Sequence, residues 1–190
     1  MGLVVGDATG KGVPAALVMS TTCGILRLAA QSSSSPGEML QRVNEALVAD
    51  IPSSTFVTCF YAILDPASGH LSYANAGHDL PYLWHGGDTE ELRARGMPLG
   101  LMPGMSYEEK EIVLKAGESA LFYSDGLVEA HDPKGELFGF PRLRALVAEH
   151  GKEHSLVGFL MEELYSFTGA GWEQEDDITL LTLRRSAARS

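Results

Sequence analysis

Carboxylates adjoin apolar segments at three widely separated points of this 190-residue chain. Asp7 follows the end of a predicted buried strand and precedes a predicted helix. Asp125 follows another apolar strand, and the pair Asp176 and Asp177 precedes the last one. Side chains at strand ends can be aimed at one point, where several carboxylates repel each other unless a cation neutralises them. The sequence therefore predicts that Asp7, Asp125 and Asp176 converge on a divalent metal ion.

The kind of ion follows from the ligand atoms. These turns offer hard oxygen donors with no histidine or cysteine close by in sequence, which favours Mg²⁺ or Mn²⁺ over Zn²⁺. Taken singly, an aspartate at a strand end is more often a turn-former or a helix cap. Both interpretations stay open for each aspartate considered alone.

A glycine-rich turn spans residues 6–12 around the first carboxylate. A phosphate-binding P-loop needs four residues between its glycines and a Ser or Thr after the lysine. Here three residues separate Gly6 from Gly10, and Gly12 follows Lys11, so we reject a P-loop. The glycines instead let the backbone turn sharply, so that a carbonyl beside Asp7 can also face an ion.

Hydrophobic periodicity and turn residues predict an α+β fold in which helices cover the faces of a sheet. A helix over 14–30 is so apolar that we expect it to be buried, and Ser35, Pro36 and Glu38 have capping-box spacing for a second helix. Further helices are predicted over 140–149 and 156–167, and strands over 55–64, 70–74, 81–84, 89–92, 107–114, 119–123 and 178–183. We expect one domain over residues 1–185 and a disordered tail over 186–190.

The composition limits the partners. The formal net charge is -11 and the isoelectric point about 4.9, which argues against nucleic acid or an anionic membrane as the main partner. No apolar run is long enough to span a membrane and no signal peptide is evident, so we expect a cytoplasmic protein. Cys23 and Cys59 lie in apolar patterns and are predicted to be free, buried thiols.

Six segments, in this order, make the chain resemble the PPM-type (2C-type) metal-dependent protein serine/threonine phosphatases, in particular their bacterial SpoIIE-like branch. They are Gly6–Leu17, Asn75–His78, Pro98–Gly100, Tyr123–Ala130, Leu137–Gly139 and Asp176–Thr179. The resemblance runs from about Val4 to Leu183. It implies a layered α-β-β-α sandwich of antiparallel sheets flanked by helices.

The resemblance also implies roles for the acidic turns. Asp7 would bridge two metal ions, Mn²⁺ or Mg²⁺, and the backbone carbonyl of Ala8 would bind the second ion. Asp125 and Asp176 would complete the first ion's ligands, and Asp177 would orient ligands or water. Thr9 and Gly126 adjoin these ligands in sequence, and we expect them to lie around the metal ligands without binding an ion themselves.

The implied reaction is direct attack of metal-activated water on phosphoserine or phosphothreonine, without a phosphoenzyme. The implied substrate is a phosphorylated bacterial regulatory protein, such as an anti-sigma-factor antagonist, and a homodimer is compatible with the sequence. His78 follows a strand in a glycine-containing turn, and we favour a structural hydrogen-bonding role over catalysis for it.

Two departures from the family pattern matter. Eukaryotic members often carry a histidine two residues after the bridging aspartate, where this chain has Thr9, as is usual in the bacterial branch. The family also has an earlier strand with an acidic Gly-Gly-Asp-type motif, which is absent ahead of Asp7, so the fold is expected to be N-terminally incomplete. The alternative functions are therefore a pseudophosphatase or truncated domain that acts as a protein-binding regulatory module, and a hydrolase of small phosphate esters.

Overall fold

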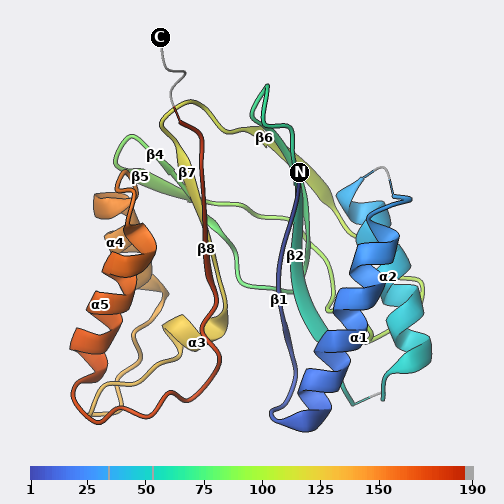
Figure 1. Ribbon diagram of the computed structural model, residues 1–190, viewed down its shortest axis with the longest axis horizontal. Helices are drawn as coiled ribbons and strands as arrows, with labels where there is room; N and C mark the ends of the chain where they lie inside the picture. Colours follow the sequence, from blue (N-terminus) through green and yellow to red (C-terminus); the bar gives the residue numbers. More distant parts are fainter. Residues whose placement is uncertain (34, 53, 187–190) are drawn as a thin grey trace. The chain divides into compact units, whose positions relative to one another are not determined.

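The computed structural model describes residues 1–33, 35–52 and 54–186 (Figure 1). Packing divides the chain into two compact units, Met1–His78 with Arg93–Val113, and Asp79–Leu92 with Leu114–Ser190. Each unit contains a four-stranded antiparallel sheet and helices, which confirms the predicted α+β fold. The single domain over residues 1–185 stays a prediction, and residues 187–190 of the predicted tail lie outside the described residues.

The sheet of the first unit has the strand order β1-β2-β3-β6. Its central hairpin forms as predicted, because β-branched and aromatic residues fill β2 and the Asp65 carboxylate accepts the N–H of Ala67 in the connecting turn. The strands of this sheet are β1 (Gly2–Ala8), β2 (Val57–Leu64), β3 (His70–Ala76) and β6 (Glu109–Val113).

Two helices, α1 (Val13–Ala29) and α2 (Pro36–Asp50), lie along one face of this sheet (Figure 1). The core between the helices and the sheet uses alternate residues of β2, namely Val57, Cys59 and Tyr61. Thr58 therefore belongs to the opposite face of the sheet, because successive strand residues point to opposite sides.

Helix α1 differs from its prediction. It buries only one side, through Val18, Thr22, Leu26 and Ala29, whereas Leu17 is 64% exposed and Leu28 is 69% exposed. The prediction that this helix is buried therefore holds for one side only, because composition alone cannot show how many of its sides meet a neighbour. Both cysteines are free as predicted, but only Cys59 is buried and Cys23 is exposed.

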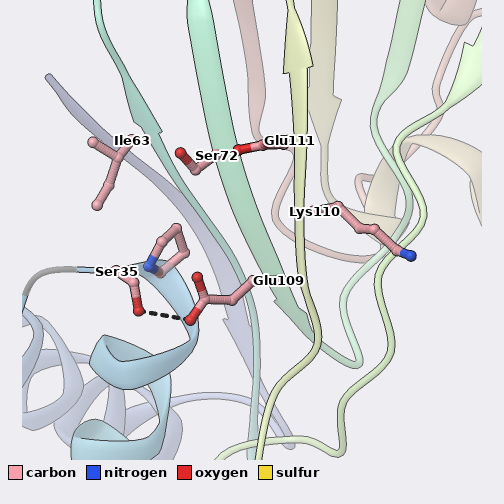
Figure 2. Close-up of a pocket in the computed structure, with 7 residues that line it drawn as sticks. Ser35, Ile63, Ser72, Glu109, Lys110 and Glu111 are labelled. Atoms are coloured by element: carbon pink, nitrogen blue, oxygen red, sulfur yellow. Dashed lines mark hydrogen bonds between the residues drawn. The ribbon is translucent and has the colours of Figure 1, made fainter.

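Helix α2 begins as its sequence predicts. The hydroxyl of Ser35 accepts the N–H of Glu38 at 3.4 Å and donates to Oε1 of Glu109 on β6 at 2.6 Å (Figure 2). Glu38 pairs with Arg42 one turn further along at 2.6 Å. A polar pocket of about 430 Å³ opens beside this helix start, between it and β3 and β6.

The sheet of the second unit has the strand order β5-β4-β7-β8. Its strands are β4 (Tyr82–His85), β5 (Asp88–Glu91), β7 (Ser119–Tyr123) and β8 (Leu180–Arg184). Gly86 and Gly87 connect β4 to β5 with φ angles of 66° and 100°, which explains why this hairpin could be predicted.

Three helices complete the second unit: α3 (Asp125–Val128), α4 (Phe140–His150) and α5 (Leu156–Thr168). The short α3 was not predicted. Helices α4 and α5 pack on one face of the sheet, and the indole N–H of Trp84 donates to the Ala148 carbonyl. Over the described part of the chain, no helix combines the length and apolarity needed to cross a membrane.

Replacing Ser35 by alanine should lower the free energy of unfolding by about 1 kcal/mol, because Glu38 loses the acceptor for its N–H and Glu109 loses a hydroxyl donor. Urea denaturation measures the change. Ser20→Ala removes an exposed hydroxyl in the middle of α1 and should change the free energy by less than about 0.5 kcal/mol. Equal unfolding curves for Ser35→Ala and the unmodified chain would contradict the cap.

Candidate functional site

Asp7 lies inside β1 rather than after it, because the strand continues through Ala8. Asp7 is directly opposite Thr58 of β2, so these two side chains share the sheet face that points away from α1 and α2. The preceding Gly6 is required for the close strand approach, since a Cβ there would lie 2.6 Å from the Thr58 carbonyl oxygen. Asp7 itself is partly exposed.

The Ala8 carbonyl points away from the sheet. The N–H of Thr9 donates to the Phe56 carbonyl of the β2 side at 3.0 Å. In a trans peptide the N–H and the C=O point in opposite directions, so the Ala8 carbonyl is directed away from β2. Because β1 is an edge strand of its sheet over the described residues, this oxygen is available to an external ligand.

A hydrogen-bonded chain of side chains reaches the Asp7 backbone. The Thr58 hydroxyl is 2.9 Å from Nδ1 of His78 and donates to the Asp7 carbonyl at 3.4 Å. Asn75 holds the His78 backbone from both sides, through its Oδ1 and its Nδ2, each at 2.8 Å. The predicted structural role of His78 agrees with these contacts, whereas no sequence signal singled out Thr58.

The second unit brings the Asp125 turn and the Asp176–Asp177 segment together. The Ser124 hydroxyl donates to the Asp177 carbonyl at 3.0 Å and accepts the N–H of Thr179 at 2.9 Å. A Cβ at Gly126 would lie 2.5 Å from the Asp177 carbonyl oxygen and 3.3 Å from that of Asp176. Gly126 is thus the residue that allows these two segments to approach.

The Asp176 carboxylate is oriented by its own segment. Its Oδ1 accepts the N–H of Asp177 at 2.9 Å, and the Gln174 side chain donates to the Asp176 carbonyl at 2.8 Å. Asp176 and Asp125 are partly buried, while Asp177 is exposed. The segment therefore holds the Asp176 side chain in a defined rotamer.

Asp79 is an acidic residue of this unit that sequence reasoning missed. Burial is the largest cause, and together with the charges of Asp125 and Glu129 it raises the pKa of the Asp79 carboxyl group to about 6. Its Oδ2 is buried without a hydrogen-bond partner. The sequence feature that could have indicated Asp79 is its position directly after Asn75–His78, a segment named above for the family resemblance.

The predicted donors belong to both units: Asp7 and Ala8 to the first, Asp125 and Asp176 to the second. Within the described residues, no group of three or more His, Cys, Asp or Glu side chains stands close enough to hold a metal ion. The convergence of the three carboxylates stays a prediction. The donor set nevertheless fits a hard divalent cation, because it combines carboxylates, an outward carbonyl and the uncompensated acidic surroundings of Asp125.

Comparison with known proteins places this chain in a family. The family model described as "Stage II sporulation protein E (SpoIIE)" matches residues 1–186. The chain belongs to the SpoIIE family. The match confirms the resemblance seen in the ordered sequence segments, and it spans both compact units.

Curated members of the SpoIIE family are longer than this chain. The phosphoserine phosphatase RsbU of Bacillus subtilis is 28% identical over 187 residues, a match that covers 96% of this chain and 55% of that protein. The protein IcfG of Synechocystis is 26% identical over 216 residues, covering 98% of this chain and 34% of that protein. The chain thus spans about half or less of the length of these relatives.

Solved structures agree with the SpoIIE assignment. The structure of the RsbU and RsbW domains of Rv1364c from Mycobacterium tuberculosis is 32% identical with a TM-score of 0.80, covering 100% of this chain and 52% of that one. The SiaA-PP2C domain of Pseudomonas aeruginosa has a TM-score of 0.86 at 23% identity, covering 96% of this chain and 75% of that one. The second likeness shows the PP2C fold alone.

Asp79→Asn should stabilise the metal-free protein at neutral pH. Because the folded state holds the Asp79 proton more tightly than the unfolded chain, the free energy of unfolding falls as the pH rises from 3.8 through about 6. The amide removes this loss, so its gain in melting temperature should be larger at pH 7.5 than at pH 4.5. Thermal melts in EDTA measure it, with the exposed Glu90→Gln as control. A gain independent of pH would contradict the assignment.

Gly126→Ala should displace the Asp176–Asp177 segment, because the new Cβ would meet backbone at 2.5 Å. We expect a lower melting temperature and an Mn²⁺ affinity reduced by about 10-fold or more. Gly158→Ala is the matched control, since Gly158 lies on α5 with nothing within 4 Å of its Cβ position. That control should be neutral or stabilising. Unchanged Mn²⁺ binding in Gly126→Ala would argue against a role of this approach in the site.

Proposed function

We propose that this chain is a metal-dependent phosphoprotein phosphatase that hydrolyses phosphoserine or phosphothreonine. The observation that carries the proposal is the close approach of the Asp125 turn to the Asp176–Asp177 segment in a SpoIIE-family chain. Two relatives, RsbU and RsbP of Bacillus subtilis, are named phosphoserine phosphatases. The RsbP match is 24% identical and covers 75% of this chain.

We assign the metal-binding roles that the family resemblance implies. Asp7 would bridge two ions, the Ala8 carbonyl would bind the second, and Asp125 and Asp176 would complete the first. The outward Ala8 carbonyl and the oriented Asp176 carboxylate support these assignments. When bound, Mn²⁺ or Mg²⁺ ions lower the pKa of water and stabilise charge on phosphoryl oxygens. Two solved relatives support such ions: a SpoIIE phosphatase domain presoaked with Mn and RsbX in complex with magnesium.

The protein's own residues supply position rather than a nucleophile. The hydroxyl of Thr9, close to the bridging aspartate in sequence, donates to the Phe56 carbonyl at 3.1 Å and is thereby held against the backbone. The Ser124 hydroxyl is likewise engaged with Asp177 and Thr179. These engagements favour direct attack of water on phosphorus over a covalent intermediate on either residue.

For the substrate, we propose a phosphorylated regulatory protein of the bacterial cell, such as an anti-sigma-factor antagonist. The support is the SpoIIE family itself, together with the phosphoserine named for its relatives RsbU and RsbP. The net charge of -11 makes nucleic acid an unfavourable partner. Recognition of a folded phosphoprotein would distinguish this enzyme from a hydrolase of small phosphate esters.

Asp7→Asn should abolish Mn²⁺-dependent release of phosphate from a phosphoserine-containing regulatory protein, lowering turnover at least about 100-fold, because the amide cannot bridge two cations. Phosphate release with and without EDTA measures the effect. Glu162→Gln, an exposed carboxylate on α5, is the charge-matched control and should keep full turnover. Equal turnover by Asp7→Asn would refute the site.

The same assay separates the alternatives. A protein-binding module would bind the phosphoprotein without releasing phosphate under any metal condition. A hydrolase of small esters would release phosphate from free phosphoserine as fast as from the phosphoprotein. The proposed phosphatase requires release from the phosphoprotein to be faster and to depend on the added ion.

A further inference from the structure

The turn that carries His78 is fixed at every residue. Asn75 and His78 are only 3% and 7% exposed, and the Asn75 side chain binds both the N–H and the carbonyl of His78. Gly77 has a φ angle of 72°, and a Cβ there would lie 2.9 Å from Pro98. The backbone of His78 is therefore held from both sides, and Nδ1 of its buried ring lies 2.9 Å from the Thr58 hydroxyl.

The directions of the hydrogen bonds that link His78, Thr58 and Asp7 follow from the protons that each group can donate. A backbone carbonyl only accepts, so the Thr58 hydroxyl must give its single proton to the Asp7 carbonyl in the 3.4 Å contact. With the hydroxyl proton used in this way, the 2.9 Å contact between Thr58 and His78 is a hydrogen bond when Nδ1 of His78 carries a proton. His78 is therefore a donor at Nδ1, and in its neutral form Nε2 is an acceptor.

The two peptide groups that flank the Ala8 Cα are thus held separately. The Asp7–Ala8 peptide lies in the ladder between β1 and β2, where its carbonyl also accepts from the Thr58 hydroxyl, and the N–H of the Ala8–Thr9 peptide donates to the Phe56 carbonyl. The contact between the Thr58 hydroxyl and the Asp7 carbonyl also restricts the ψ angle of Asp7. The side chains of Asp7 and Thr58 share one face of the sheet. The Thr58 hydroxyl thus contacts the backbone between the two predicted metal donors of this strand end and touches neither donor atom.

We propose that His78 is a positioning residue that acts through Thr58 on the strand end bearing Asp7 and Ala8. This inference rests on the proposed function, because it is the metal-binding role of Asp7 that gives the orientation its value. His78 itself donates no proton to substrate in this role. It locks the Thr58 hydroxyl into the rotamer that meets the Asp7 carbonyl, and the metal donors are then held before an ion arrives.

The decisive pair of variants is Thr58→Val and Thr58→Ser. Valine keeps the β-branched shape and removes the hydroxyl, whereas serine keeps the hydroxyl. Thr58→Val should raise the Kd for Mn²⁺ about 10-fold and lower kcat with little change in KM for the phosphoprotein, whereas Thr58→Ser should stay close to the unmodified chain. Mn²⁺ binding is read by electron paramagnetic resonance of the free ion, independently of turnover.

The histidine is tested by the two amides that imitate its nitrogens. The amide of His78→Asn can place a donor near the position of Nδ1, whereas that of His78→Gln reaches the position of Nε2. We expect His78→Asn to keep most of the Mn²⁺ affinity and His78→Gln to lose it about as far as Thr58→Val. Because both residues act in one chain, Thr58→Val combined with His78→Gln should be no worse than either alone.

Controls keep this inference separate from the proposed function. Thr182→Val makes the same change on β8 of the other unit and should bind Mn²⁺ normally. If Asp7→Asn leaves Mn²⁺ binding unchanged, the proposed site is wrong and this inference falls with it. If Asp7→Asn abolishes binding while Thr58→Val matches Thr182→Val, the positioning role alone is refuted. Equal losses in Thr58→Val and Thr58→Ser, or multiplying losses in the double variant, would also overturn it.

Discussion

The register between β1 and β2 is the constraint on which the first half of the site depends. Asp7 faces Thr58, and side chains alternate between the two faces of a sheet. A slip by one residue would move the Asp7 carboxylate to the face covered by α1 and α2 and bring Ala8 out of the core. Gly6 permits this register because a Cβ there would collide with the Thr58 carbonyl oxygen. The same strand pairing therefore sets both the core packing and the position of the predicted metal donors Asp7 and Ala8.

In the second unit, different interactions position the predicted metal donors. Here the donors lie outside the strands, on a short helix start and on an irregular segment, so no ladder can hold them. The Ser124 hydroxyl performs this task by bonding to the segment at both Asp177 and Thr179. Negative charge gathers beside the Asp125 turn as well, because the pKa of Asp79 is raised first by burial and then by the charges of Asp125 and Glu129. A cation would offset the repulsion between these carboxylates. The same charge that destabilises the metal-free unit would therefore favour binding of a metal ion.

The sequence predicted those parts of the fold that are determined locally. Both hairpins follow from their turns, Asp65–Gly69 and Gly86–Gly87, and α2 follows from its Ser35 cap. The sequence did not predict which strands pair when they are far apart in the chain. For example, β6 and β7 are separated by a short connection, yet they belong to different sheets. The exposure of Leu17 on α1 escaped it for the same reason, since periodicity shows that a helix has an apolar side but not which neighbours cover it.

As with the fold, the sequence indicated some residues of the candidate site and not others. Asp125 and Asp176 could be named as candidates because carboxylates next to apolar strands are recognisable in the sequence. The structure brings their segments together, and their role as metal ligands stays a prediction. Thr58 was not found, because a threonine in a β-strand is ordinary and only the register places it opposite Asp7. Asp79 was not found, because its raised pKa depends on burial and on charges about 50 residues away in the chain.

The departure at Thr9 has a definite chemical consequence for the proposed reaction. A phosphate ester leaves as an alkoxide that must be protonated, and a histidine at this position could supply the proton. The Thr9 hydroxyl has one proton, which it donates to the Phe56 carbonyl, and its own pKa is far too high for a general acid at neutral pH. The role of Thr9 is therefore to reinforce the backbone hydrogen bond that turns the Ala8 carbonyl outward, since both of its donors meet the same oxygen of Phe56. In the proposed reaction, Thr9 would therefore serve backbone geometry, and water would protonate the leaving group.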